Sequence, residues 1–356
     1  MSEYTNIDFS SDNLEKVLEG MSKEINRTAS KCKSLINAPP TFVFEPIGHF
    51  DEVDFENQKY PQQFHWACNF LSIPRYIEIF NYINLKAMIE YLEDSFNLLN
   101  NNYVNEKSIY SFCIYIRSFL EQFAYYSSSI DEIIEICQPI KQLEILEGSN
   151  FKVTKENIGD FITIFGKAAI SLDAIIKPST IDVSKLVSNE DISEDISIDK
   201  EEARKPNNII GKLKKLEKKV PALHPLYSAC SELIHPNSFP FISQANFVGE
   251  FSDKGYLLLG YDFKKQKSSG LIEIPALFIG DRLIKCLKDI EIYLVEREKL
   301  IGKTQRSILL KSRKLARSWM TNTLPYSPIF KGAKDCPCGS RKSFLKCCGK
   351  YMTKSK

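Results

Sequence analysis

Four cysteines near the end of the chain have the types and spacing of a metal site. Cys336, Cys338, Cys347 and Cys348 form a C-x-C-x8-C-C pattern within thirteen residues. Two close pairs of thiolates can converge on one tetrahedral zinc ion, with Zn–S distances of about 2.3 Å. Disulfides explain the pattern poorly, because adjacent cysteines bridge only with strain. The sequence therefore predicts a zinc knuckle at residues 335–356, with zinc as its cofactor.

These residues resemble the SEC-C motif, a zinc tail found on the bacterial preprotein translocase ATPase and on many otherwise unrelated bacterial proteins. The likeness covers about fifteen residues, with C-P-C-G-S at the start and C-C-G at the end. Arg341 replaces the usual glycine of that motif. In the translocase the motif contacts a chaperone, the ribosome and lipid. The resemblance thus implies a small recognition module that docks a partner, and it does not identify that partner.

A second set of polar residues lies in two apolar segments of the chain body. Arg117 and Glu121 are one helical turn apart, and Tyr227, Ser231 and His235 recur every four residues before a proline. His235 could act as a general acid or base, and Arg117 could stabilise a charged phosphorane. Glu121 would orient either group, while Tyr227 or Ser231 would bind phosphate. The same residues could instead form a structural polar network or a noncatalytic ligand site.

The two segments also resemble bacterial helical proteins of the HEPN-like fold, with R-x3-E on one helix and Y-x3-S-x3-H-P on a later one. The resemblance covers residues 108–240 and implies a metal-independent ribonuclease, since many members are RNases in toxin and antiviral systems. The chain departs from the family's ribonuclease signature, which is R-x4-6-H on a single helix. Residues 228–230, where that arginine would stand, are Ser, Ala and Cys.

Positive charge is concentrated at the end of the chain. From Lys303 onward there are fourteen lysines and arginines against one acid, Asp335, which gives a net charge of +13. The whole chain carries +2, so residues 1–302 carry −11. A basic module of this kind attracts anionic partners. We expect its densest part to bind nucleic acid through four residues of one helix end: Lys311, Arg313, Lys314 and Arg317.

Hydrophobic periodicity predicts a mainly α fold, a HEPN-like helical body with a small antiparallel β ribbon, a long C-terminal helix and the zinc knuckle. We expect an N-terminal helix and loop in residues 1–60, the body in 61–320 and a tether in 321–334. Within the body, 179–208 form an acidic linker and 241–274 the ribbon, whose third strand is 270–274. The expected helices span residues 12–36, 73–99, 108–126, 130–146, 158–176, 209–233 and 275–320, and the helix at 209–233 is expected to be interrupted near Pro221.

The composition is that of an ordinary cytoplasmic protein, with 43% hydrophobic residues and no apolar run long enough to span a membrane. The six cysteines outside the tail are scattered singly and are expected to be reduced, buried hydrophobes. Walker, dinucleotide-binding, zinc-protease and serine-hydrolase motifs do not occur.

Two functions follow from these observations. The first is a cytoplasmic bacterial effector of stress or phage defence that is RNase-like or binds RNA or the ribosome. The second is a noncatalytic adaptor whose SEC-C tail docks a protein partner. A homodimer is compatible with either.

Overall fold

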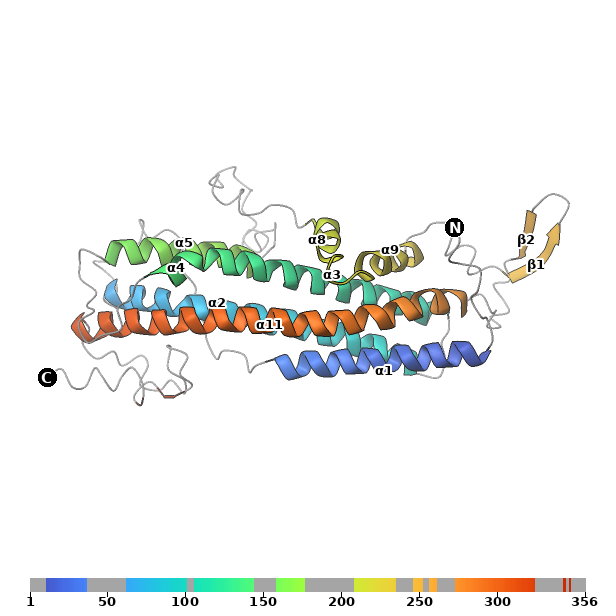
Figure 1. Cartoon of the computed structure of the whole chain (residues 1–356), viewed down its shortest axis with the longest axis horizontal. Coiled ribbons are helices and arrows are strands. Elements are labelled where there is room, and N and C mark those ends of the chain that lie inside the picture. Colours follow the sequence, from blue (N-terminus) through green and yellow to red (C-terminus); the bar gives the residue numbers. More distant parts are fainter. Residues whose placement is uncertain are drawn as a thin grey trace, which may run out of the picture. The chain divides into compact units, whose positions relative to one another are not determined.

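The computed structural model describes residues 11–36, 62–100, 106–143, 158–176, 208–234, 246–251, 256–260 and 273–323, together with 342, 343 and 346. This described part is mainly helical, as the sequence predicts (Figure 1). None of its helices is long and apolar enough to cross a membrane. The acidic segment before Asn208 and the four cysteines of the knuckle lie outside the described residues.

Eight helices and two strands are described. The helices are α1 (Ser11–Leu35), α2 (Gln62–Asn100), α3 (Glu106–Ile136), α4 (Gln138–Gln142), α5 (Ile158–Ile176), α8 (Ile209–Leu216), α9 (Leu223–Ile234) and α11 (Glu273–Thr323). The strands β1 (Asn246–Phe251) and β2 (Tyr256–Gly260) pair in antiparallel fashion, with a register shift between Phe247 and Gly249. The expected third strand at 270–274 is wrong at its end, because Glu273 and Ile274 begin α11.

The chain divides into two compact units that are each discontinuous in sequence. Unit 1 contains residues 1–36, 83–128 and 208–297, and unit 2 contains residues 37–82, 129–207 and 298–356. Helices α2, α3 and α11 each contribute one part of their length to unit 1 and the other part to unit 2.

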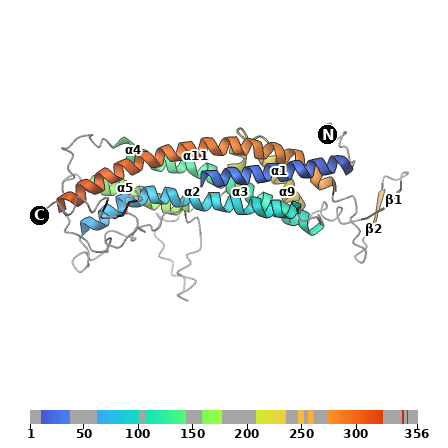
Figure 2. The same ribbon diagram turned by 90° about the horizontal axis from the view of Figure 1, so that it is seen from below.

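In unit 1, α1 packs closely along the first part of α11 (Figure 2). Glycines allow this approach. A Cβ on Gly280 would lie 2.2 Å from Cγ1 of Val17, and a Cβ on Gly20 would lie 2.9 Å from Cδ1 of Ile284. Val17 and Met21 are buried on the facing side of α1. The absence of side chains at these glycines therefore sets how near the two helix backbones come.

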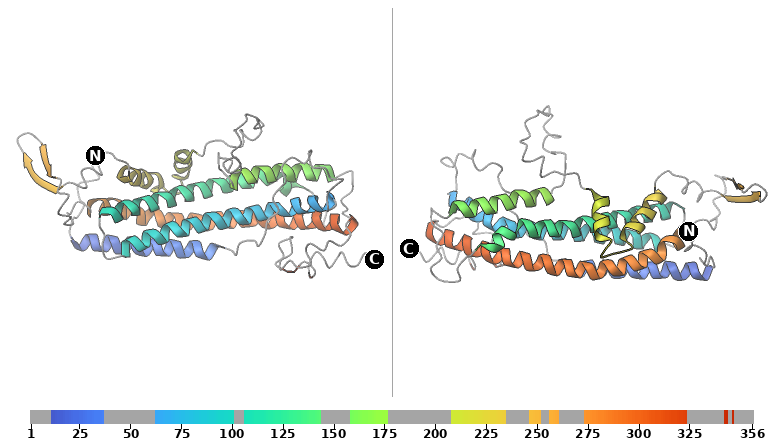
Figure 3. Two further views of the ribbon diagram at one scale, coloured as in Figure 1. Left: turned by 180° about the vertical axis from the view of Figure 1, so that it is seen from behind. Right: turned by 45° about the horizontal axis from the view of Figure 1, so that its top comes forward.

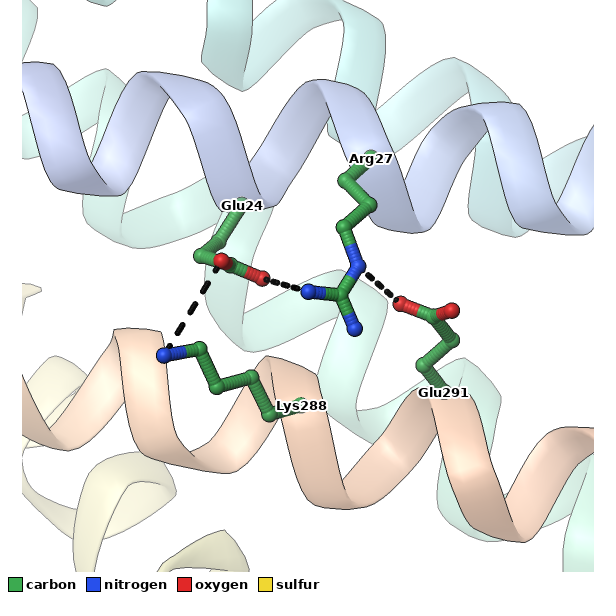
Figure 4. Close-up of polar contacts among 4 residues, drawn as sticks. All are labelled: Glu24, Arg27, Lys288 and Glu291. Atoms are coloured by element: carbon green, nitrogen blue, oxygen red, sulfur yellow. Dashed lines mark hydrogen bonds and ion pairs between the residues drawn. The ribbon is translucent and has the colours of Figure 1, made fainter.

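Ion pairs border the same contact (Figure 4). Arg27 donates from Nε to Glu291 at 2.7 Å and lies 3.4 Å from Glu24, while Nζ of Lys288 lies 4.0 Å from Glu24. The hydrogen bond and charge of Glu291 raise the pKa of Arg27. The Arg27 side chain is 49% exposed, so these pairs add little stability.

Unit 2 joins α5 and the end of α11 to the first part of α2. Phe70 of α2 and Phe165 of α5 meet edge to face, with ring centroids 4.9 Å apart. On the α11 side, Gln305 donates to Glu78 at 2.9 Å, and Asn81 donates to Glu298 at 3.4 Å. An aromatic contact and two polar contacts thus fix both neighbours of α2 in this unit.

The largest differences from the sequence-based prediction of helices are in α2 and α3. The predicted helix begins at Ile73, but α2 begins at Gln62 and keeps Pro74 inside. The predicted helices 108–126 and 130–146 are separated at residues 127–129, but α3 runs through these three serines to Ile136. All three serines are buried within the helix, where their small size suits close packing.

Candidate functional site

The structure brings together three of the five residues predicted for the catalytic site. Arg117 and Glu121 lie one turn apart on α3, and Arg117 Nε donates to Glu121 Oε1 at 3.0 Å. The Tyr227 hydroxyl on α9 donates to the same oxygen, also at 3.0 Å. The Arg117 guanidinium carbon lies 5.3 Å from the centre of the Tyr227 ring. One carboxylate oxygen therefore joins an arginine and a phenol from two helices of unit 1.

Helix α9 lies beside α3 (Figure 3), and the packing of its apolar side positions this network. Leu223, Leu226, Tyr227, Cys230 and Leu233 recur at helical spacing and are the buried face of α9. On the α3 side, Cys113 is buried and contacts Cys230 of α9. The Tyr227 ring is held in this contact and its hydroxyl reaches the border, where Arg117 and Glu121 remain 27% and 36% exposed.

The electrostatics keep both donors of the network protonated. Burial raises the pKa of Tyr227, and the hydrogen bond to Glu121 raises it further. Burial lowers the pKa of Arg117, but the hydrogen bond to Glu121 and the nearby Tyr227 raise it by more, so the pKa of Arg117 is raised overall. At neutral pH Tyr227 is thus a neutral donor and Arg117 a cation. Neither group can serve as a general base.

The remaining two residues of the predicted site behave differently. Ser231 Oγ is buried and has no hydrogen-bond partner among the described residues. His235, the predicted acid or base, directly follows the end of α9 and lies outside the described residues. The geometry therefore establishes a polar network of Arg117, Glu121 and Tyr227, while the ribonuclease arrangement through His235 stays a prediction.

Five of the six cysteines outside the tail follow the prediction of buried, free thiols, and the side chain of Cys68 lies outside the described residues. Cys32, Cys113, Cys137, Cys230 and Cys286 are all free and buried. Burial raises the pKa of Cys32 and of Cys137 to about 12. Cys113 of α3 and Cys230 of α9 are hydrogen-bonded to each other, a contact that adds to the α3–α9 packing.

The four residues of α11 that were predicted to bind nucleic acid differ in their exposure and in their contacts. Lys311 Nζ donates to two carbonyl oxygens at the end of α4, that of Lys141 and that of Leu143, the latter at 2.6 Å. Carbonyls at a helix C-terminus lack intrahelical partners and attract a cation. Burial, followed by the charge of Lys314, lowers the pKa of Lys311. Lys311 thus serves as a cap for α4.

A basic stripe lies on the solvent face of α11. Lys314 of the predicted set is exposed there, and Lys299, Lys303 and Arg306 are exposed as well. Their offsets of 4, 7 and 15 residues from Lys299 place all four on one side of a helix with 3.6 residues per turn. Arg313 is half-buried, and Arg317 lies on α11 beyond the last residue whose side chain is described.

Three of these stripe residues, Lys299, Lys303 and Arg306, are absent from the four-residue site predicted from sequence. The charge excess from Lys303 onward was the available signal, and the helical spacing of the three residues would have placed them with Lys314. Local charge density instead favoured the cluster that begins at Lys311. Lys311 is directed toward α4, and only the tertiary structure supplies those carbonyl groups.

The cysteines of the predicted zinc knuckle lie outside the described residues, so their geometry is not part of this structure. Their donor set fits zinc, because four thiolates complete a closed tetrahedral site. In the described part of the chain, no group of three His, Cys, Asp or Glu side chains is placed to hold a metal ion.

Comparison of the chain with protein-family models, curated proteins and solved structures gave no match.

Proposed function

We propose that the protein binds RNA, free or within the ribosome, through the basic second half of α11, and that the basic segment after it in the sequence adds to the affinity. The single observation that carries this proposal is the basic stripe Lys299, Lys303, Arg306 and Lys314 on the exposed face of α11. Lysine and arginine contacts to phosphate give affinity without reading base sequence.

The charge of the rest of the chain supports this assignment. Residues from Lys303 onward carry +13, against −11 for the preceding residues. This concentration of positive charge attracts a polyanion toward the C-terminal part of the chain and raises the rate of association. The SEC-C-like knuckle belongs to the same proposal as a zinc-stabilised recognition module at the end of the basic segment.

Cleavage of RNA is a second candidate, favoured by one observation. Arg117 of α3 and Tyr227 of α9 are more than one hundred residues apart in the sequence, and the structure brings them into contact. Helix α9 ends just before His235. The network also has a structural role without chemistry, because Glu121 accepts hydrogen bonds from both donors and links α3 to α9. A noncatalytic adaptor with a protein partner is the alternative outcome.

Two measurements on the purified full chain separate these functions. Incubation with total RNA compares wild type with His235→Ala, and the ribonuclease candidate fails if neither protein, or both equally, cleave the RNA. Fluorescence anisotropy with labelled RNA at physiological salt tests binding. Measurable binding that weakens with rising salt supports the proposal. Undetectable binding, together with a protein partner that is lost in Cys347→Ser, would leave the adaptor as the function.

A further inference from the structure

A second cluster of cations lies on unit 1, at α8 and the turn that follows it. The sequence from Lys212 to Lys219 contains five lysines and one acid, Glu217. Lys214, Lys215, Lys218 and Lys219 are exposed, and no ion pair joins any of them to another described residue. We call these four residues the α8 lysine surface. Its charge is compensated by Glu217 alone within this segment.

The local structure explains why the four lysines share one surface. Leu213, Leu216 and Val220 are buried, and their spacing of three and four residues turns the apolar side of α8 toward the protein. Asn208 caps the helix by accepting from the backbone amide of Gly211 at 2.9 Å. Because the helix start and its apolar side are both fixed, the lysines between the apolar positions have a defined direction.

Lys212 attaches this surface to α3. Its ammonium lies 4.8 Å from the centre of the Tyr125 ring. This contact is one turn along α3 from Glu121, where Tyr227 of α9 is bound. Since α8 and α9 both contact α3, the α8 lysine surface lies on unit 1 at the contact of these helices.

We propose that the α8 lysine surface is a second binding site for the phosphate backbone of RNA. This inference rests on the RNA-binding function proposed above and assigns a further part of the contact to unit 1. Four exposed ammonium groups, two in the last turn of α8 and two in the turn that follows it, match a chain of regularly repeated negative charges.

Two other partners fit the surface less well. Protein interfaces are depleted in lysine and need an apolar centre, whereas Ile210 is the only large exposed hydrophobic residue described on α8. Insertion into a membrane surface requires a free apolar helix face. In α8 that face is formed by Leu213 and Leu216, and both are buried in the protein.

The test uses two full-length variants that lose the same charge. The site variant carries Lys214→Gln, Lys215→Gln, Lys218→Gln and Lys219→Gln. The matched control carries glutamine at four exposed lysines of other helices for which no ion pair is described, namely Lys16, Lys23, Lys167 and Lys285. Binding of a labelled mixed-sequence single-stranded RNA is measured by anisotropy between about 50 and 200 mM salt, where phosphate contacts are screened strongly.

If all four lysines contact phosphate, the slope of log K against log salt falls by roughly 0.7 for each lost contact on a single strand. The ratio of the wild-type binding constant to that of the site variant then falls by roughly 50-fold between about 50 and 200 mM salt. The control should keep a slope close to that of wild type. Two double variants, Lys214→Gln with Lys215→Gln and Lys218→Gln with Lys219→Gln, should each show about half of the slope change of the site variant. A proportional change of this kind distinguishes lost phosphate contacts from loss of fold.

Four results would overturn the inference. Equal slopes for the site variant and the control would mean that net charge alone acts. Displacement of the RNA by polyglutamate at equal charge concentration would assign the surface to an acidic protein. Failure of wild type to bind RNA would remove this inference and the proposed function together. If a variant of the α11 stripe loses binding while the site variant keeps it, the proposed function stands and this second site alone is rejected.

Discussion

Gly280 offers a sharp test of the packing between α1 and α11, which forms one side of unit 1. Replacing it with alanine adds a methyl group whose carbon would lie 2.2 Å from Val17 Cγ1 and 3.1 Å from Met21 Sδ. Valine has one preferred rotamer in a helix and cannot turn away easily. We expect an overpacking cost of about 3 kcal/mol, the upper end of the usual range. Alanine in place of glycine returns about 1 kcal/mol of helix propensity. The net loss in free energy of unfolding should be about 2 kcal/mol.

Gly302 provides the matched control on the same helix. A Cβ at this position would have no heavy atom within 4 Å, so Gly302→Ala keeps only the gain in helix propensity. We expect it to stabilise the protein by about 1 kcal/mol. The two substitutions are chemically identical, and the predicted difference of about 3 kcal/mol arises from the contact with α1 alone.

Urea unfolding followed by circular dichroism measures both variants. Val17→Ala completes a double-mutant cycle with Gly280→Ala, because truncation of Val17 makes space for the added methyl group. We expect a favourable coupling energy of about 1 to 2 kcal/mol. The packing argument is refuted if Gly280→Ala stabilises the protein as Gly302→Ala does, or if the cycle shows no coupling.

Three further predictions concern individual contacts. Tyr227→Phe removes the hydroxyl that donates to Glu121 and should lower the free energy of unfolding by about 1 kcal/mol, measured by urea unfolding; no change would mean that the network is not formed. Lys311→Met keeps the aliphatic stem but leaves the carbonyls at the end of α4 without their cation, and should cost about 1 to 2 kcal/mol, whereas Lys303→Met should stay within about 0.5 kcal/mol. Burial raises the pKa of Cys32 to about 12, so N-ethylmaleimide at pH 8 should label its peptide in urea and not in the native protein. The same shift makes the folded thiol hold its proton more tightly than the unfolded one, so its contribution to stability is complete below about pH 8.5 and is lost as the pH rises toward 12. Rapid native labelling would contradict the burial of Cys32.

Apolar periodicity was sufficient to predict most of the helices. The prediction for α5 has the observed ends, Ile158 and Ile176, and α1 differs from its prediction by one residue at each end. These segments have a single apolar stripe and few competing signals. The interruption near Pro221 was also predicted, since α8 ends at Leu216 and α9 begins at Leu223.

Errors in the prediction arose where local preference opposed tertiary packing. Pro74 and the serines at 127–129 are local signals for helix ends, yet both lie inside helices whose flanking residues are buried. Burial of those neighbours outweighs the local penalties of a proline or of serines.

The candidate site was predictable in its residue types and only partly in its contacts. The spacing of Arg117 and Glu121 predicts their pairing, because residues four apart on a helix are neighbours. That Tyr227 shares the same Glu121 oxygen depends on how α9 packs on α3, which the sequence pattern does not contain. In the same way, the charge of Lys311 is evident from sequence, but its carbonyl partners come from α4, about 170 residues earlier in the chain.

The central claim is that the exposed basic stripe of α11 binds the phosphate backbone of RNA. Its most direct test is the salt dependence of RNA binding by wild type and by a variant with glutamine at Lys299, Lys303, Arg306 and Lys314. We expect the variant to bind more weakly, with a slope of log K against log salt that is lower by roughly 0.7 for each lost contact, and with an unchanged circular dichroism spectrum. Equal affinity and equal slope for the two proteins would contradict the claim.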